Sequence, residues 1–166
     1  MGDNKNITNQ KKSIKMSEMD GKYLTFFTDN QLFGVPIADV VQIVGMQNVT
    51  QVPEFPHYAK GIINLRGNII PVIDVRLRLG KAEKEYDERT CIIVTTIQDR
   101  AAGFIVDAVD AVSEIDSTLI SPPPHISGNG ETFLSGIAKL SEKIVLLLNS
   151  SKLLTDEMFK ELVYEA

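Results

Sequence analysis

Short hydrophobic runs separated by turn residues fill the chain from Lys22 onward. Runs of this length, rich in Val, Ile, Phe and Thr, are typical of β-strands, whereas helices need longer segments with a period of about 3.6 residues. Pro71 interrupts one run, which indicates an edge strand or a bulge at that point. The pattern therefore predicts an all-β fold, with strands at "KYLTFFT", "LFGVPI", "NIIPVIDV", "RTCIIVTTI", "AAGFIVDAV" and "KIVLLLN".

The ends of the chain and one long loop have other patterns. Residues 1–20 are polar and rich in Lys, Asn and Ser, which predicts a disordered tail, with a recognition arm as the alternative. The closing "TDEMFKELVYEA" has Thr155 as a possible N-cap and Met158 and Leu162 at helical spacing, so we expect a short C-terminal helix. Residues 121–136 contain three prolines followed by glycines, and we expect a long loop there.

Two copies of one pattern follow each other along the chain. Their matches come in the same order at offsets of 69 and 75 residues, which favours duplication over chance similarity. A half of about 65 residues is too small to bury a comfortable core alone. We expect each half to curl into a small barrel, which removes exposed strand edges, and the two barrels to pack about a pseudo-twofold axis with a groove between them. The matches pair Gly34, Ile37, Val40 and Ile43 with Gly103, Val106, Val109 and Val112, and Gly61, Ile62, Leu65 and Ile69 with Gly136, Ile137, Leu140 and Ile144.

The composition limits the class of protein. With 166 residues, of which 43% are hydrophobic and 23% charged, the chain is expected to fold as one domain or two small subdomains. Its net charge of −5 argues against a nucleic-acid coat or a polybasic membrane clamp. A single-stranded nucleic-acid-binding barrel is a remote alternative, because that class uses basic grooves and stacking aromatics, and this chain has no Trp, 7 Phe and 4 Tyr.

Three sequence features favour a cytoplasmic protein without direct membrane insertion. No hydrophobic run reaches the roughly 20 residues that span a bilayer. The N-terminus lacks the apolar region of a secretory signal. Cys91 is the one cysteine, so no disulfide can form within the chain, which favours a reducing compartment.

The titratable residues are too scattered to form a catalytic or metal site. His57 and His125 lie in proline-flanked loops, and with a single cysteine they lack the spacing of a zinc site. Asp107 and Asp110 stand among apolar neighbours, which fits a solvated rim better than an acid–base pair. We therefore expect neither enzyme activity nor a cofactor. An enzyme with a site in the long loop is the alternative, and it would have to use His125 and Glu131.

Two segments, 35–44 and 104–112, hold more aliphatic side chains than one face of a strand can bury. A fully buried strand explains such a pattern. An exposed apolar patch that binds a partner explains it equally well.

The segment "GIINLRGNIIPVIDVRLRLG", residues 61–80, places Arg66 at the tip of a hydrophobic hairpin. The second copy has "LSEK" at the corresponding place, residues 140–143, so the turn alone does not require an arginine. Gly67-Asn68 suits a tight turn with positive φ. Arg66 is therefore either a solvated turn residue or a polar anchor on a partner-binding surface.

This segment resembles the Gly-x-x-Asn-Leu-Arg-Gly-x-x-x-Pro-x-x-Asp-Leu-Arg pattern of the CheW-like domain of bacterial chemotaxis, with Val75 in place of the usual Leu. The resemblance runs from about Lys22 to the C-terminus and includes "FGVPIADVVQIV", "VPEFPHYAKG", "GFIVDAV" and "LSGIAKLSEKIVLLLNSSKLL". It implies an all-β fold of two packed five-stranded Src-homology-3-like β-barrels with a short C-terminal helix. Residues 1–20 would be a disordered tail and residues 21–166 one CheW-like domain of two interleaved barrel subdomains.

The function that the resemblance implies is that of a non-enzymatic cytoplasmic adaptor. Such adaptors couple the cytoplasmic tips of methyl-accepting chemoreceptors to the regulatory domain of the histidine kinase CheA in membrane-bound receptor arrays. The same role in a pilus or other non-flagellar chemosensory pathway is the alternative.

The resemblance also implies a partner-binding site around the hairpin. Arg66 matches the arginine of the family's Arg-Gly pair, and Val40 and Gly61 match neighbouring positions of the same surface. Gln42 stands where family members often have a Glu that can pair with this arginine, so the charge-assisted hydrogen bond is lost. Together with the exposed-patch interpretation, the expected site consists of Arg66, Val40, Ile43, Gln42, Gly61, Asn64, Gly67, Val106 and Val112.

Overall fold

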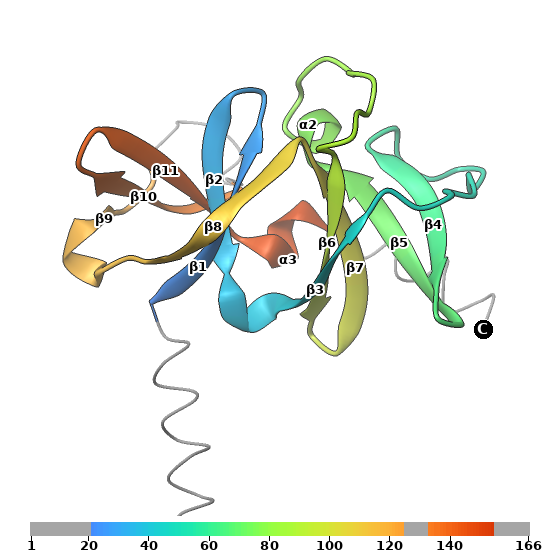
Figure 1. Cartoon of the computed structure of the whole chain (residues 1–166), viewed down its shortest axis with the longest axis horizontal. Helices are drawn as coiled ribbons and strands as arrows, with labels where there is room; N and C mark the ends of the chain where they lie inside the picture. The colour runs from blue at the N-terminus through green and yellow to red at the C-terminus, as the bar shows by residue number, and fades with distance from the viewer. Residues whose placement is uncertain (1–20, 125–132, 155–166) are drawn as a thin grey trace, which may run out of the picture.

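The computed structural model describes residues 21–124 and 133–154, in which β-strands are the main regular secondary structure (Figure 1). The predicted tail and C-terminal helix lie outside the described residues. The strands are β1 (Lys22–Thr28), β2 (Gln31–Pro36), β3 (Val40–Gly45), β4 (Ala59–Leu65), β5 (Asn68–Asp74), β6 (Cys91–Ile97), β7 (Arg100–Val106), β8 (Ala108–Glu114), β9 (Ile120–Ser121), β10 (Leu134–Leu140) and β11 (Lys143–Leu148). The short helical elements are η1 (Ile37–Asp39), α2 (Val75–Arg78), η2 (Ser117–Leu119) and α3 (Ser150–Leu153).

The all-β prediction is confirmed, since each predicted run contains a strand. One run, "AAGFIVDAV", is divided at Asp107 between β7 and β8. The predicted loop at 121–136 is too long, because Ser121 belongs to β9 and β10 begins at Leu134. Pro71 lies neither in an edge strand nor at a bulge: β5 is placed between β7 and β4, and its pairing with β7 begins at the next residue, Val72.

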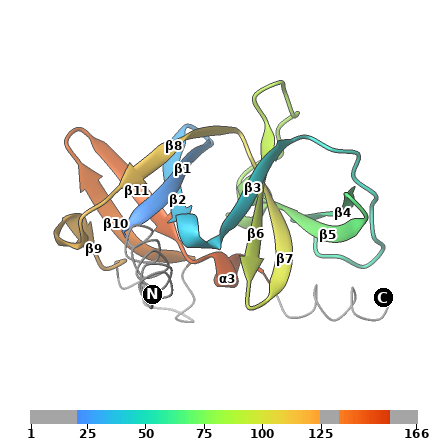
Figure 2. The same ribbon diagram turned by 60° about the horizontal axis from the view of Figure 1, so that its bottom comes forward.

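The strands form two curled sheets that lie side by side (Figure 2). The central barrel has the strand order β3-β6-β7-β5-β4, and all its strands come from residues 40–106. The terminal barrel has the order β8-β1-β2-β11-β10-β9 and combines strands from both ends of the chain. A bridge between Thr50 and Ile62 connects the segment after β3 to β4, and β9 pairs with β10 in the corresponding way. The chain therefore forms the two packed barrels that the sequence predicted.

The two repeats exchange their first hairpins, so the expectation that each half closes its own barrel is wrong. The matched glycines Gly34 and Gly103 relate the β1–β2 hairpin to the β6–β7 hairpin. Yet β1 and β2 pair with β8 and β11 of the second half, while β6 and β7 pair with β3 and β5 of the first half. Both glycines lie at the parallel junctions between halves, where a Cβ on Gly103 would come within 2.9 Å of Val72. Glycine thus permits the close approach of strands from different halves.

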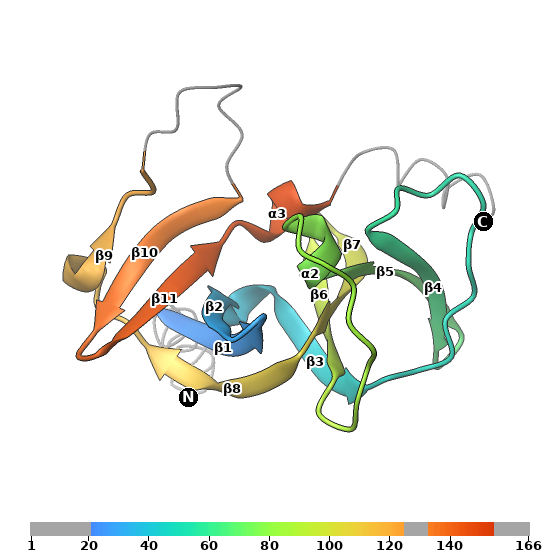
Figure 3. The same cartoon turned by 90° about the horizontal axis from the view of Figure 1, so that it is seen from above.

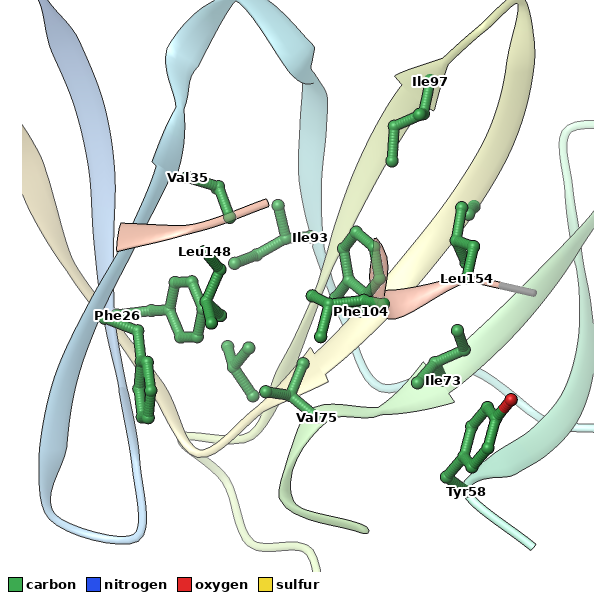
Figure 4. Packing of buried hydrophobic residues seen from close by; sticks show 14 of the residues in the cluster. Phe26, Val35, Tyr58, Ile73, Val75, Ile93, Ile97, Phe104, Leu148 and Leu154 are labelled. Atoms are coloured by element: carbon green, nitrogen blue, oxygen red, sulfur yellow. The ribbon is translucent and has the colours of Figure 1, made fainter. Parts of the chain in front are cut away.

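The hydrophobic core has three parts. One cluster fills the central barrel around Ile63 and Ile105, and another fills the terminal barrel around Val145 and Leu147. The third cluster lies between the barrels and takes side chains from both (Figure 4). Because this shared cluster is covered by one barrel on each side, the barrels bury apolar surface against each other in addition to the apolar surface in their own interiors. Its members drawn and labelled are Phe26, Val35, Tyr58, Ile73, Val75, Ile93, Ile97, Phe104, Leu148 and Leu154.

Candidate partner-binding surface

The tip of the β4–β5 hairpin is a two-residue turn formed by Arg66 and Gly67, since Leu65 pairs with Asn68. Both turn residues have positive φ, 54° for Arg66 and 87° for Gly67. The turn therefore begins one residue earlier than the sequence suggested, and Arg66 is part of it. The side chain of Asn64 braces the turn, because its Oδ1 accepts a hydrogen bond from the Gly67 N–H at 2.9 Å.

Positive φ at this place is a property of the tight hairpins in this fold. Ser141, at the matching position of the β10–β11 hairpin, has φ 46°. The Asp29-Asn30 and Gln98-Asp99 turns have positive φ at both residues. Asn, Asp and Gly tolerate this conformation best, and arginine offers no local compensation for it. The backbone conformation consequently gives no reason for an arginine at position 66. A reason has to come from the arginine side chain.

The guanidinium of Arg66 is exposed and makes no hydrogen bond or ion pair with any residue that the structure describes. Gln42 lies half-buried on β3, opposite Val94 of β6, and no hydrogen bond joins its side chain to Arg66 within 21–124 and 133–154. A planar group with five N–H donors is thus exposed at the tip of the hairpin. A carboxylate or a backbone carbonyl of another molecule fits such a group.

Strand β3 carries the aliphatic part of the surface. A bulge between Val40 and Gln42 inserts Val41, after which the side chains alternate. Val40 is half-buried against the shared core between the barrels, whereas Ile43 is 44% exposed and Val41 is 59% exposed. Sequence reasoning named Ile43 and missed Val41, although both belong to the apolar segment 35–44.

Two of the predicted residues of the central barrel, Val40 and Arg66, lie at the same end of it. Val40, at the start of β3, pairs with Thr95, close to the β6–β7 turn. Strands β5 and β7 run parallel, so the Arg66-Gly67 turn that precedes β5 lies at the same end as the turn that precedes β7 (Figure 1). Val40 and Arg66 are therefore at one end of the central barrel, with Gln42 and Ile43 farther along β3.

Gly61 is required by the backbone that lies against it. It is buried, its φ is 143°, and a Cβ at this position would lie 2.0 Å from the carbonyl oxygen of Thr50. The bridge between Thr50 and Ile62 brings these two backbones together. Gly61 thus permits barrel closure, which holds the neighbouring hairpin in place.

The two residues predicted from the second half of the chain differ in burial. Val112 lies on β8 of the terminal barrel and is 57% exposed. Val106 is 1% exposed and belongs to the core between the barrels, so the prediction that it contacts a partner is wrong. The cause is barrel packing: the expected groove is filled at this point by side chains of both barrels. Two exposed isoleucines were missed, Ile69 at 57% and Ile144 at 54%, although the repeat pairs them.

The surroundings of Asp107, Asp110 and Cys91 favour structural roles over chemistry. Asp107 accepts hydrogen bonds from Arg76 and from the backbone of Asp29, and Asp110 accepts one from Thr25, so the two carboxylates do not form a pair. Burial raises the pKa of the Cys91 thiol, which disfavours a reactive thiolate.

The described residues also bear on metal and membrane binding. Among them, no group of three His, Cys, Asp or Glu side chains is arranged to hold a metal ion. In the same part of the chain, no helix has the length and apolarity needed to cross a membrane. His125 and Glu131, the pair for an enzyme in the long loop, lie outside the described residues.

Comparison with known proteins agrees with this architecture. Residues 22–158 match the family model described as the CheW-like domain. The chain is 34% identical over 137 residues to the chemotaxis protein CheW of Klebsiella aerogenes, covering 82% of each chain. It is 29% identical over 135 residues to the protein FrzA of Myxococcus xanthus, covering 80% of this chain and 84% of FrzA. The crystal structure of the scaffolding protein TtCheW from Thermoanaerobacter tengcongensis superposes with a TM-score of 0.73 at 39% identity, covering 78% of this chain and 88% of TtCheW.

Proposed function

The chain belongs to the CheW-like domain family, and from this premise we propose that it couples the cytoplasmic tip of a chemoreceptor to the regulatory domain of the histidine kinase CheA. As a family member it is a scaffold of chemotaxis signalling. The finer assignment of its two partners is a proposal. It is supported by the surface at the β4–β5 hairpin and β3.

The observation that carries the proposal is that the Arg66 guanidinium has no hydrogen-bond or ion-pair partner among residues 21–124 and 133–154, on a turn whose backbone favours other residues. A helical partner that docks on a surface needs exposed aliphatics together with a few polar anchors. Val41 and Ile43 supply the aliphatic contacts, and Arg66 supplies the anchor. The surface is supported by the hydrogen bond from the Gly67 N–H to Asn64 and by the close backbone approach at Gly61.

The neighbouring positions have separate roles in the proposal. Val40, at the start of β3, is half-buried and packs against the core beneath the exposed Val41 and Ile43. Gln42 is neutral, so it offers the Arg66 guanidinium no carboxylate. The receptor tip would therefore provide the acceptor for Arg66. Val112 adds an aliphatic contact from the terminal barrel, and the exposed Ile69 and Ile144 supply one apolar contact on each barrel for the kinase domain.

A second candidate is the same adaptor role in a non-flagellar chemosensory pathway. The similarity to FrzA, whose coverage of this chain is comparable to that of the chemotaxis proteins CheW, supports it. The geometry of the site is the same for both candidates. The genes adjacent to the coding sequence distinguish them.

Co-purification with a CheA regulatory domain and a receptor signalling tip tests the proposal. We expect Arg66→Ala to weaken recovery of the receptor tip about tenfold or more, because truncation of a central arginine anchor commonly has an effect of this size. Lys143→Ala is the matched control, since it removes an exposed cation next to the turn of the equivalent hairpin. Unchanged recovery with Arg66→Ala would reduce Arg66 to a turn residue.

A further inference from the structure

Helix α2 lies at the junction of the two barrels, close to α3 (Figure 3). The chain crosses between the barrels at residues 36–40 and again at residues 106–108. Besides these covalent links and the shared core, two arginines of α2, Arg76 and Arg78, reach from the central barrel to other parts of the molecule. Neither belongs to the proposed partner surface.

Arg76 ties α2 to the terminal barrel and to the second crossing. Its side chain is 10% exposed, and its Nη1 lies 3.0 Å from the Oδ1 of Asp29, in the β1–β2 turn. Its Nη2 forms an ion pair with Asp107, the residue between β7 and β8. Lys81 adds an ion pair to Asp29 at 3.1 Å. The Asp107 carboxylate also accepts the backbone N–H of Asp29 at 2.9 Å, so turn, crossing and helix form one network.

The charges in this network depend on one another. Asp29 and Asp107 stand side by side and would repel each other without the cation between them. Hydrogen bonding to Lys81 and to Arg76 lowers the pKa of Asp29. Burial opposes the charge on Arg76, yet its hydrogen bonds and charge interactions with Asp107 and Asp29 raise its pKa. The planar guanidinium bridges the two carboxylates with separate nitrogens held in a fixed fork, whereas a lysine offers a single ammonium on a flexible stem.

Arg78 makes a second link on the same helix. Its guanidinium lies between the rings of Tyr58 and Phe133, 4.4 Å from each ring centroid. Tyr58 precedes β4 of the central barrel, and Phe133 precedes β10 of the terminal barrel. Its Nε donates to the carbonyl of Leu153 at 2.9 Å, and its Nη2 donates to the carbonyl of Lys152 at 3.2 Å. Arg78 thus joins both barrels and the end of α3.

We propose that α2 is a latch that fixes the orientation of the two barrels, with Arg76 and Arg78 as positioning residues for partner coupling. The latch matters because Arg66 and Ile69 lie on the central barrel whereas Val112 and Ile144 lie on the terminal barrel, so the orientation of the barrels sets the geometry of the proposed contacts. The coupling part rests on the proposed function, whereas the orientation part does not. Loosening the latch leaves every contact residue in place and changes only the orientation of one barrel relative to the other.

Spin-label distances between the barrels test the orientation part. Labels are placed at Thr96→Cys on β6 and Lys139→Cys on β10, both exposed positions, in a Cys91→Ala background. We expect Arg76→Gln and Arg78→Met to broaden the distance distribution relative to the parent. Lys60→Gln is the matched control, because it removes an ion pair from β4 to Glu83, in the loop between α2 and β6, that does not reach the terminal barrel.

A second variant changes the network at an exposed residue, so that the test does not depend on a buried substitution that could prevent folding. Asp29→Asn removes the ion pairs of Asp29 with Arg76 and Lys81 without changing a buried residue. We expect it to broaden the distances as well, and to speed amide exchange in the β1–β2 turn about tenfold or more, as the loss of a charged hydrogen bond implies. If Asp29→Asn and Arg76→Gln fold and give the parent distribution, the latch is refuted.

The coupling part has its own readout. Arg76→Gln is expected to bind the receptor tip with an affinity within about twofold of the parent, because Arg66, Val41 and Ile43 all lie on the central barrel, and to lose most of the receptor control of kinase activity. Arg76→Lys is expected to restore it only in part. Full receptor control in a variant with broadened distances would overturn the coupling part. Arg66→Ala tests the proposed function through its binding to the receptor tip, whereas the Arg76 variants test the latch. Failure of the proposed function and failure of the latch are therefore distinguishable.

Discussion

Arg66 occupies a backbone conformation that suits asparagine or glycine better than arginine. The repeat provides a comparison within the molecule, because Ser141 has nearly the same φ at the matching turn. Arg66 disfavours its own turn and forms no hydrogen bond or ion pair with the described residues, which supports the proposed role of its side chain. Natural proteins commonly give up stability at such positions for function.

This trade-off makes a prediction at Arg66. Arg66→Asn creates an Asn-Gly turn, the preferred pair for two positive φ values, and we expect it to stabilise the fold by about 0.5–1 kcal/mol. The same variant should lose receptor binding. Urea unfolding and co-purification measure the two effects. Ser141→Asn is the control: it should gain stability and keep binding, and a loss of binding there would speak against a special role of Arg66.

Gly61 and Gly67 lie a few residues apart and should respond differently to alanine. Gly61→Ala places a Cβ 2.0 Å from the Thr50 carbonyl oxygen, and we expect a destabilisation of about 3 kcal/mol or more. Gly67→Ala meets open space and bears only the cost of its positive φ, about 1–2 kcal/mol. Denaturant midpoints of the two variants test the difference. Equal losses would show that barrel closure does not depend on Gly61.

At the scale of elements, α2 depends on a buried carboxylate. Asp74 is 2% exposed, and its Oδ1 accepts the backbone N–H groups of Arg76 and Leu77, which caps the helix. Its Oδ2 accepts the hydroxyl of Tyr86 at 2.7 Å. A buried carboxylate needs these donors because they replace the hydrogen bonds to water that it loses on burial. The latch helix is thus held by a residue of the loop that follows it.

Tyr86→Phe tests this support. Loss of the hydroxyl leaves one oxygen of Asp74 short of a donor, and we expect a destabilisation of about 1–3 kcal/mol at neutral pH. Burial, together with the hydrogen bond to Asp74, raises the pKa of Tyr86. The folded pKa is therefore above the unfolded value of about 10, so this contribution is present below pH ~10 and is lost as pH rises further.

The measurement is urea unfolding between neutral and alkaline pH. The parent protein should lose stability above pH ~10, and Tyr86→Phe should lose less over the same range, so the two curves converge. Parallel curves would mean that Tyr86 does not titrate differently in the folded and unfolded states. Parallel curves together with equal stability would remove the proposed support of Asp74.

At the scale of the molecule, the exchanged hairpins make the halves interdependent. Each barrel is completed by strands of the other half, and the core between the barrels draws on both. A repeat expressed alone would expose its unpaired edges and half of that core. Marginal stability leaves no reserve for such a loss.

We therefore expect residues 22–90 and residues 91–154 to remain unfolded when produced separately. Amide dispersion in nuclear magnetic resonance spectra is the measurement. Mixing the two fragments should restore dispersed spectra in part, because the strand pairing requires only that both halves be present. A folded fragment 22–90 would show that the first half can close on itself, as the repeat alone suggested.

Much of the fold was predictable because local rules act on neighbouring residues. The strand runs, the repeat and the hairpin followed from hydrophobic pattern and turn residues, which depend on short stretches of chain. Ile43 and Val112 were predicted as surface residues, and both are exposed. Val41, Ile69 and Ile144 carry the same aliphatic signal as core residues, so periodicity did not separate them from the core.

By itself, the sequence determined the β architecture, the duplication and the family to which the hairpin motif belongs, because each is encoded in local pattern. Only the tertiary structure decided which half completes which barrel, since strand pairing between distant segments follows from burial of both faces. That choice buried Val106 between the barrels and brought Asp29, Arg76 and Asp107 together from three separate segments. Contacts between residues so far apart in the chain produce no periodic pattern of hydrophobic and polar residues, so they cannot be predicted from the sequence pattern.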